Sequence, residues 1–383
     1  MSKKNYGELC PPKRLLLGAG PSNVDPRVLK AMVSPIVEHL DPYFIEVMDE
    51  TVELLRFAFK TKNRITLPIS GSGSAGMESA ICNLIEKGDE AIVCVNGFFG
   101  ERMKEMVQRC GGTPIVVKAD WGKPITCDAV AEALSNSNAK VVTIVHAETS
   151  TGVIQPLKEI SKIVHEHDAL LVVDAVTSLG GCELDIDDFR IDICYSASQK
   201  CLSCAPGLAP ITANEKAMET IRNRKTKVQS WYLDLSTIEK YWLENNRVYH
   251  HTAPILLVYA LREALRLLYE EGLENRWQRH IKHSQELIER LEDLGLKTHV
   301  EEPKYRCPAL TSIRVPEGIQ DKNIRNTLRE QFNITISGGL GDLAGQIIRI
   351  GLMGVNANRN SVKLVTEALE YALKKEGYQK ITE

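Results

Sequence analysis

The sequence predicts an α/β protein with a large domain, built on a mostly parallel sheet, and a smaller α/β domain that follows it. Between about residues 60 and 215, short apolar runs alternate with longer amphipathic stretches. This alternation is typical of βαβ units, in which helices cover both faces of a parallel sheet. Beyond residue 310 the pattern changes to shorter strands and helices. A chain of 383 residues is long enough for both domains.

The positions of the apolar runs give the expected order of elements. In the large domain we expect strands over 65–69, 91–95, 114–117, 141–145, 170–174 and 191–195, and helices over 77–86, 100–110 and 157–167. A long helical stretch over 253–295 breaks near Gly272. Strands over 310–315 and 346–350 and helices over 322–332 and 361–374 complete the chain. The expected division is an N-terminal arm (1–22), a large domain (23–272) and a small domain (273–383).

Composition limits the classes of function. Hydrophobic residues make up 43% of the chain and charged residues 25%, as in soluble globular proteins. The net charge of −3 gives no basic surface for nucleic acid, and no apolar run is long enough to span a membrane. The first residues lack the apolar stretch of a signal peptide, the last are not a peroxisomal signal, and ten cysteines in so long a chain do not indicate a disulfide framework. We therefore expect a cytoplasmic protein.

One lysine and one aspartate carry the strongest chemical signal. Asp174 ends the apolar run 170–174, and Lys200 follows the run 191–195. Ligands of open α/β sheets bind at the carboxyl ends of the strands, where both side chains are expected. A lysine amine that condenses with an aldehyde, and a carboxylate that keeps a pyridine nitrogen protonated, are what pyridoxal phosphate (PLP) requires. Alone, each residue would more often be a surface lysine or a helix-capping acid, but the pair predicts a PLP site.

A glycine-rich turn supports this prediction. Residues 70–78 follow an apolar run and open a helix, whose free backbone N–H groups suit a phosphate. The same glycines satisfy the dinucleotide pattern G-x-G-x-x-G, which needs an acid at the end of the next strand. That strand ends at Asn96, so the acid is missing. A phosphate site is favoured, with a plain tight turn as the alternative.

Two further residues are candidates for binding. Arg349 lies inside an apolar run, where a charge is costly unless it is paired. It could clamp a substrate carboxylate, or it could belong to an internal salt bridge. Phe99 follows a strand end and could stack on the pyridine ring or fill the core. No metal site is predicted, because the adjacent histidines 250 and 251 would point apart on an extended segment and no acid is suitably spaced.

Together these motifs resemble the alanine–glyoxylate and serine–pyruvate aminotransferases over nearly the whole chain. The matching stretches are 16–23, 70–78, 148–152, 173–181, 198–200, 249–252 and 349–354. The resemblance implies the fold of type I PLP-dependent transferases and a homodimer with shared active sites. It also implies transfer of an amino group from a small amino acid, alanine or serine, to a 2-oxo acid such as glyoxylate.

The resemblance assigns a role to each matching residue. Lys200 would hold PLP and carry the proton, and Asp174 would pair with the pyridine nitrogen. The other implied cofactor contacts are Ser72, Gly73, Ser74, Phe99, Thr149, Val176, Gln199, Tyr249 and Thr252, of which Tyr249 and Thr252 would come from the neighbouring subunit. The implied substrate contacts are Arg349, Gly20 and Thr149. The chain departs from the animal enzymes it resembles at two positions, with Phe99 in place of a tryptophan and Ser74 in place of a histidine.

Three other functions stay open at this point. A cysteine desulfurase or lyase of the same fold would need a mobile nucleophilic cysteine, for which Cys307 is the nearest candidate. A nicotinamide (NAD) dehydrogenase could use the glycine-rich turn, although its acid is missing. A binding or scaffold protein without activity would not need Lys200, Asp174 and Arg349 together. The single visible carboxylate clamp favours small neutral amino donors over dicarboxylates.

Overall fold

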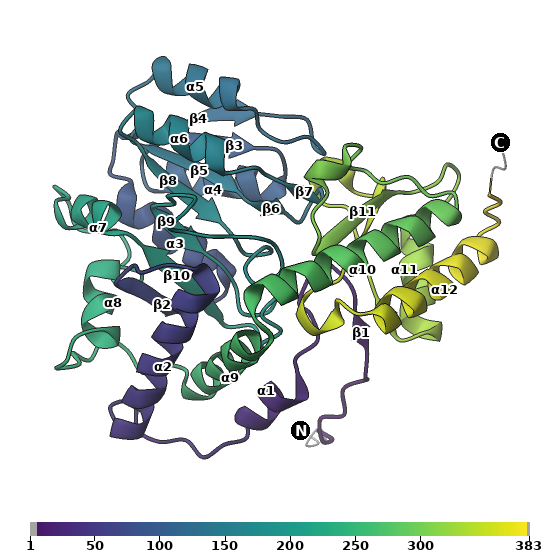
Figure 1. Ribbon diagram of the computed structural model, residues 1–383, viewed down its shortest axis with the longest axis horizontal. Coiled ribbons are helices and arrows are strands. Elements are labelled where there is room, and N and C mark those ends of the chain that lie inside the picture. The colour runs from purple at the N-terminus through teal and green to yellow at the C-terminus, as the bar shows by residue number, and fades with distance from the viewer. Residues whose placement is uncertain (1–5, 381–383) are drawn as a thin grey trace, which may run out of the picture.

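The computed structural model describes residues 6–380, and Figure 1 shows a larger α/β part joined to a smaller one. Residues 1–5 of the expected arm and 381–383 of the expected small domain lie outside the described residues. The larger part holds the strands and helices from β2 to β10, and the smaller part holds the elements from α10 to α12. The prediction of an α/β fold with a mostly parallel sheet is confirmed.

The large sheet has seven strands in the order β2-β10-β9-β8-β5-β3-β4. Their bounds are β2 (Ile65–Ser70), β3 (Glu90–Val95), β4 (Thr113–Lys118), β5 (Val141–Val145), β8 (Leu170–Asp174), β9 (Ile193–Tyr195) and β10 (Leu208–Ala213). Neighbours from β4 to β9 are parallel, whereas β10 is antiparallel to both β9 and β2. The sequence did not reveal this reversal. Residues 196–207, which link β9 to β10, contain no helix and so do not form the crossover that joins parallel strands.

Helices cover this sheet on both faces. They are α1 (Pro26–Ala31), α2 (Pro42–Phe59), α3 (Gly73–Leu84), α4 (Phe98–Arg109), α5 (Cys127–Ser135), α6 (Lys158–Glu166), α7 (Glu215–Arg222), α8 (Leu235–Trp242) and α9 (Ile255–Glu271). Helix α3 packs against α4 and α7, α5 packs against α6, and α2 packs against α9. Every residue of β5 and β8 is buried, which explains why these strands read as continuous apolar runs.

The smaller part is built on a second sheet and a separate hydrophobic core. Its three antiparallel strands are β11 (Leu310–Arg314), β14 (Ile347–Gly351) and β13 (Ser337–Gly338), with β14 in the centre. The helices are α10 (Leu273–Asp293), α11 (Asp321–Gln331) and α12 (Arg359–Lys375), with 3-10 turns η1 (Pro303–Tyr305), η2 (Gly341–Leu343) and η3 (Gly354–Asn356). A hairpin of β6 (Ala147–Glu148) and β7 (Val153–Ile154) lies beside the large sheet.

The first described residues belong to the second core. Strand β1 (Leu15–Leu16) pairs in parallel with β12 (Ile334–Thr335), and Leu17 is fully buried among residues of α10, α11 and α12. The expected arm therefore contains a strand, which is too short to give a periodic pattern.

The long helical stretch breaks where the sequence predicts it. Gly272, at φ 79°, separates α9 from α10 in a backbone conformation that glycine adopts without strain. Leu273 and Trp277 at the start of α10 still pack in the large core. A domain boundary at residue 272 stays a prediction.

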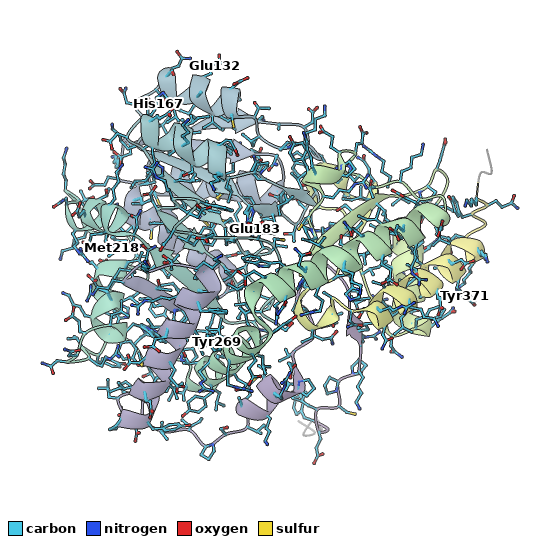
Figure 2. All side chains as sticks on the ribbon, in the orientation of Figure 1. Glu132, His167, Glu183, Met218, Tyr269 and Tyr371 are labelled. Atoms are coloured by element: carbon cyan, nitrogen blue, oxygen red, sulfur yellow. The ribbon has the colours of Figure 1, made fainter. Side chains whose placement is uncertain are left out.

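The outer faces of the helices remain exposed. Tyr269 on α9 and Tyr371 on α12, both labelled in Figure 2, are 58% and 49% exposed. Among residues 6–380, no helix combines the length and the apolar character that crossing a membrane requires.

Candidate active site

Lys200 lies in the loop that follows β9 and is only 9% exposed. Its amine Nζ donates a hydrogen bond to the carbonyl oxygen of Ala19. Burial lowers the pKa of Lys200 to about 8, because the charged form loses its hydration. Gly20 explains how the chain passes so close: a Cβ atom there would lie 2.5 Å from Nζ, and the φ of 103° also favours glycine.

Asp174 ends β8, directly opposite Tyr195 at the end of β9. Its carboxylate accepts hydrogen bonds from the Val176 backbone N–H at 2.8 Å and from the Tyr195 hydroxyl at 3.0 Å. Burial raises the pKa of Asp174 to about 6, and the nearby charge of Lys200 opposes the rise. The parallel pairing of β8 and β9 thus brings the two predicted groups to one edge of the sheet. Sequence reasoning missed Tyr195, which reads as one more residue of an apolar run.

The glycine-rich turn meets the loops that carry these two residues. Ser72 is the N-cap of α3, and its side chain makes no capping hydrogen bond. A Cβ atom on Gly73 would lie 2.9 Å from Ala197 and 3.1 Å from Val176, so only glycine allows the start of α3 to approach so closely. The N-terminus of α3 therefore opens beside Lys200 and Asp174, as a phosphate site would require.

Arg349 is a buried cation on the central strand of the small sheet. It lies on β14 and is 4% exposed. Its Nε donates to the carbonyl oxygen of Gly338 and its Nη1 to that of Thr149, each at 2.8 Å. In the described part of the chain no carboxylate lies within 4.0 Å of it, so the internal salt bridge that we kept as an alternative is not present. Burial lowers the pKa of Arg349 to about 10, and Glu148 opposes this shift.

Glu148 is a buried carboxylate that sequence reasoning did not single out. It accepts hydrogen bonds from the backbone N–H of Phe99 at 3.1 Å and from the hydroxyl of Ser150 at 2.6 Å. Burial raises its pKa. Glu148 thus fixes the first turn of α4 and the place of the Phe99 ring. Its position in the motif 148–152 was visible in the sequence, but its contacts with a segment fifty residues earlier were not.

The remaining predicted residues divide into two groups. Thr149 accepts a hydrogen bond from the Thr177 hydroxyl at 3.5 Å, and the amide oxygen of Gln199 is buried without a partner among residues 6–380. Tyr249 is instead 57% exposed, and its hydroxyl lies 3.5 Å from that of Thr252. This second group has no hydrogen bond to the other predicted site residues in the part that the structure describes.

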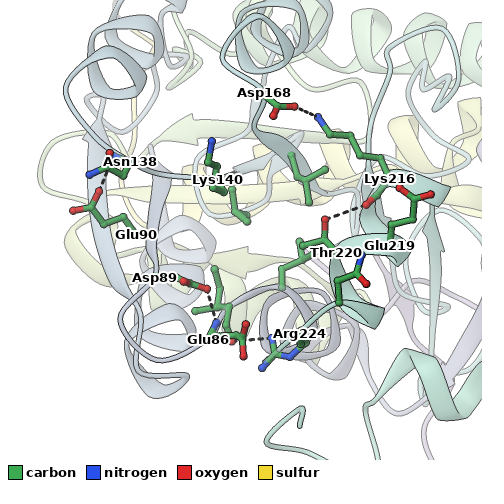
Figure 3. A pocket seen from close by; sticks show the side chains of 15 residues that line it. Glu86, Asp89, Glu90, Asn138, Lys140, Asp168, Lys216, Glu219, Thr220 and Arg224 are labelled. Carbon is green, nitrogen blue, oxygen red and sulfur yellow. Dashed lines mark hydrogen bonds and ion pairs between the residues drawn. The ribbon is translucent and has the colours of Figure 1, made fainter. Parts of the chain in front are cut away.

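A cavity of about 530 Å³ lies at the opposite edge of the same sheet (Figure 3). It opens at the first residues of β3, β5 and β8, and its lining includes Lys140, Asp168, Lys216 and Arg224. Lys216 and Asp168 form an ion pair at 2.8 Å. Because Lys200 and Asp174 lie at the carboxyl ends of the strands, this cavity is separate from the candidate active site.

Comparison with known proteins agrees with this geometry. Residues 14–364 match the sequence profile of the class-V aminotransferases. The chain belongs to this family. It is 41% identical to the alanine–glyoxylate aminotransferase of the rabbit, Oryctolagus cuniculus, over 95% of this chain and 94% of that protein.

Two solved aminotransferase structures superpose closely on this one. The alanine–glyoxylate aminotransferase of Nostoc sp. has a TM-score of 0.95 at 46% identity and covers 97% of this chain and 98% of its own. The ureidoglycine–glyoxylate aminotransferase of Bacillus subtilis has a TM-score of 0.95 at 39% identity, over 98% and 96%. The protein is therefore a PLP-dependent aminotransferase.

The residues at this aminotransferase site fit PLP. The buried amine of Lys200 matches the aldehyde, and the carboxylate of Asp174 matches the pyridine nitrogen. The N-terminus of α3 suits the phosphate, whose oxygens can accept hydrogen bonds from the free backbone N–H groups there. The site thus offers partners for the aldehyde, the pyridine nitrogen and the phosphate of the cofactor.

The desulfurase alternative finds no support in the placement of Cys307. This thiol is 2% exposed and lies 3.9 Å from the thiol of Cys182 in a small apolar cluster. It is therefore held in the interior, whereas a desulfurase needs a cysteine on a mobile segment. The likeness to a solved cysteine desulfurase, at 15% identity, shows the shared fold alone.

Proposed function

We propose that this aminotransferase transfers the amino group of a small neutral amino acid, alanine or serine, to glyoxylate. The observation that carries this proposal is Arg349, a buried cation without a carboxylate partner in the described chain. Such a cation binds the α-carboxylate that every amino acid carries. The names of the relatives, with glyoxylate in both the rabbit and the Bacillus enzymes, support the choice of acceptor.

Each residue of the site has a proposed task in this reaction. When bound, PLP supplies an aldehyde carbon for the amino group and a ring that withdraws electrons. Lys200 would take the Cα proton as a neutral amine and, as an ammonium group, would deliver it to the carbon that PLP contributes as its aldehyde. Asp174 keeps the ring nitrogen protonated, and its hydrogen bonds from Val176 and Tyr195 hold the carboxylate in place.

We propose further that the phosphate is held by Ser72, Gly73, Ser74 and Gln199, and the ring by Phe99, Val176 and Thr149. Gly20 is a proposed substrate contact, because its backbone lies directly against the Lys200 side chain. Tyr249 and Thr252 reach the site of a second copy, so the active unit is a homodimer. We also propose that the enzyme is cytoplasmic. In the single chain Tyr249 and the neighbouring Trp231 are 57% and 63% exposed. Large apolar side chains exposed in this way support a surface that a second copy covers in the dimer.

(S)-Ureidoglycine is a second candidate donor. The Bacillus subtilis enzyme named for it is 38% identical over 96% of this chain. Its carboxylate would use the same clamp, so the choice between donors depends on the side-chain pocket.

A single experiment tests the proposed reaction. The absorbance of the purified protein with PLP is recorded before and after alanine, serine or (S)-ureidoglycine is added, and again after glyoxylate. We expect alanine or serine to bleach the band of the bound aldehyde and glyoxylate to restore it. A protein that takes up no PLP would refute the cofactor site, and a band that only ureidoglycine bleaches would refute the small neutral donor.

A variant shows whether Arg349 is the clamp. Arg349→Gln should raise KM for alanine about a hundredfold, since a charge-assisted pair contributes about 1.5–3 kcal/mol. An unchanged KM would place the carboxylate elsewhere. The exposed Arg109, which pairs with Glu105 on α4, is the matched control for the same substitution.

A further inference from the structure

Helix α4 carries one cation that differs from its neighbours. Lys104 pairs with Glu101 at 2.8 Å, and Arg109 pairs with Glu105 at 2.6 Å. Arg102 has no carboxylate within 4.0 Å among residues 6–380. Its Nη1 instead donates a hydrogen bond of 3.2 Å to the Ser74 hydroxyl.

This contact leaves the Ser74 hydroxyl ready to donate. Ser74 is the second residue of α3, where backbone N–H groups have no partner within the helix. Because its oxygen accepts from Arg102, its own proton is available for another acceptor. The N–H groups, the Ser74 hydroxyl and the charge of Arg102 all favour an anion at this point.

The same guanidinium contacts the aromatic side of the site. Its central carbon lies 4.9 Å from the centre of the Phe99 ring and 5.3 Å from that of Phe98. Arg102 therefore contacts both Ser74 and Phe99, the two positions at which the chain departs from the animal enzymes that it resembles. A cation stacked on rings in this way is also held in place by them.

We propose that Arg102 is a positioning residue for the cofactor phosphate. It orients the Ser74 hydroxyl toward the anion and adds a positive charge behind the N-terminus of α3. The inference rests on the proposed phosphate site at Ser72–Ser74. A purely structural role, in which Arg102 only supports the Phe99 ring, would act on the pyridine ring and not on the phosphate.

Comparing PLP with pyridoxal, which lacks the phosphate, separates the two roles. The cofactor is removed from the full-length protein, and dissociation constants for both compounds are measured by absorbance and by quenching of tryptophan fluorescence. The variants are Arg102→Gln, Ser74→Ala and the double variant, with Arg109→Gln as the control on the same helix. Circular dichroism before binding checks that each variant folds.

We expect Arg102→Gln to weaken PLP binding about tenfold and to leave pyridoxal binding within about twofold of wild type. Ser74→Ala should act in the same direction. The loss of PLP affinity in the double variant should be smaller than the product of the two single losses, because both changes remove the same interaction between Arg102 and Ser74. Arg109→Gln should bind both compounds as the wild type does.

Several outcomes would overturn the inference. Equal losses for PLP and pyridoxal would show that Arg102 supports only the ring, and wild-type affinity in Arg102→Gln would show no role in binding. If Arg102→Gln does not fold, Ser74→Ala decides alone, and unchanged PLP binding in that variant contradicts the proposal. Failure of the wild type to bind PLP would instead refute the proposed function itself.

Discussion

The two edges of the large sheet each carry a lysine and an aspartate, yet the pairs differ in every physical respect. At the carboxyl ends Lys200 and Asp174 are 9% and 3% exposed. At the amino ends the side chains of Lys216 and Asp168 are 45% and 83% exposed and form an ion pair. The cavity of about 530 Å³ shown in Figure 3 lies at the amino edge.

The difference shows what distinguishes a reactive pair from a solvated one. Burial raises the pKa of Asp174, whereas the hydrogen bond from Lys216 lowers the pKa of Asp168. Water solvates the charges of Lys216 and Asp168 at the amino edge, so neither group becomes more reactive. At the carboxyl edge desolvation moves the pKa of Lys200 and that of Asp174 toward neutrality, where proton transfer is most useful.

Removing Lys200 gives the strongest test of this contrast. Lys200→Ala should lower the transamination rate at least about a thousandfold, because both the covalent attachment and the proton carrier are lost. The rate is measured with alanine and glyoxylate at saturation. A variant that retains a tenth of wild-type turnover would contradict the assignment of Lys200.

The aspartates allow a more conservative test. Asp174→Asn keeps the shape of the side chain but removes the charge that holds the ring nitrogen protonated. Turnover should fall about a hundredfold. Asp168→Asn, which makes the same change at the amino edge, serves as the control and should leave turnover within about twofold. Equal effects at the two edges would remove the basis of the comparison.

The pH dependence of PLP attachment sharpens the contrast between buried and exposed lysines. The lowered pKa means that Lys200 reaches its neutral, nucleophilic form near pH 8 instead of near pH 10.5. In cofactor-free protein the attachment rate should therefore rise about tenfold from pH 7 and level off just above pH 8. A lysine model compound should continue to gain until about pH 10.5. Stopped-flow absorbance gives both profiles, and a protein profile that follows the model compound would contradict the lowered pKa.

The smallest effect is expected from breaking the exposed pair. Lys216→Ala should leave turnover within about twofold, and it should shift the midpoint of thermal unfolding by no more than about 1 °C. A large loss of activity would mean that the amino-edge cavity takes part in catalysis. Differential scanning calorimetry and the alanine–glyoxylate assay provide the two measurements.

The sequence predicts the strand ends well because they combine two strong local signals. Val141–Val145 and Leu170–Asp174 form strands over the predicted bounds, since an apolar run that is buried on both faces ends abruptly at a polar group. Asp174 and the loop of Lys200 follow from that pattern. The break at Gly272 was equally visible.

What the sequence could not show depends on contacts between distant segments. The hydroxyl of Tyr195 reaches Asp174, and Arg102 reaches Ser74, only because strands and helices pack side by side. Each of these residues has an ordinary local explanation, as an apolar strand residue or a helix-surface cation. Strand β10 was not among the predicted strands, and its antiparallel direction would have stayed hidden in any case, because periodicity reveals a strand but not its direction.

Strand β1 ties the completion of the site to the order in which the chain is synthesised. Leu15 and Leu16 pair with Ile334 and Thr335, and the carbonyl oxygen of Ala19, just after them, receives the amine of Lys200. Because translation proceeds from the N-terminus, Leu15 and Leu16 have no strand partner until Ile334 and Thr335 have been synthesised. The large sheet can assemble on the ribosome well before that moment. The β1–β12 pairing beside Lys200 therefore forms only after Thr335 has been synthesised, so a nascent chain can have a folded sheet before it has a complete active site.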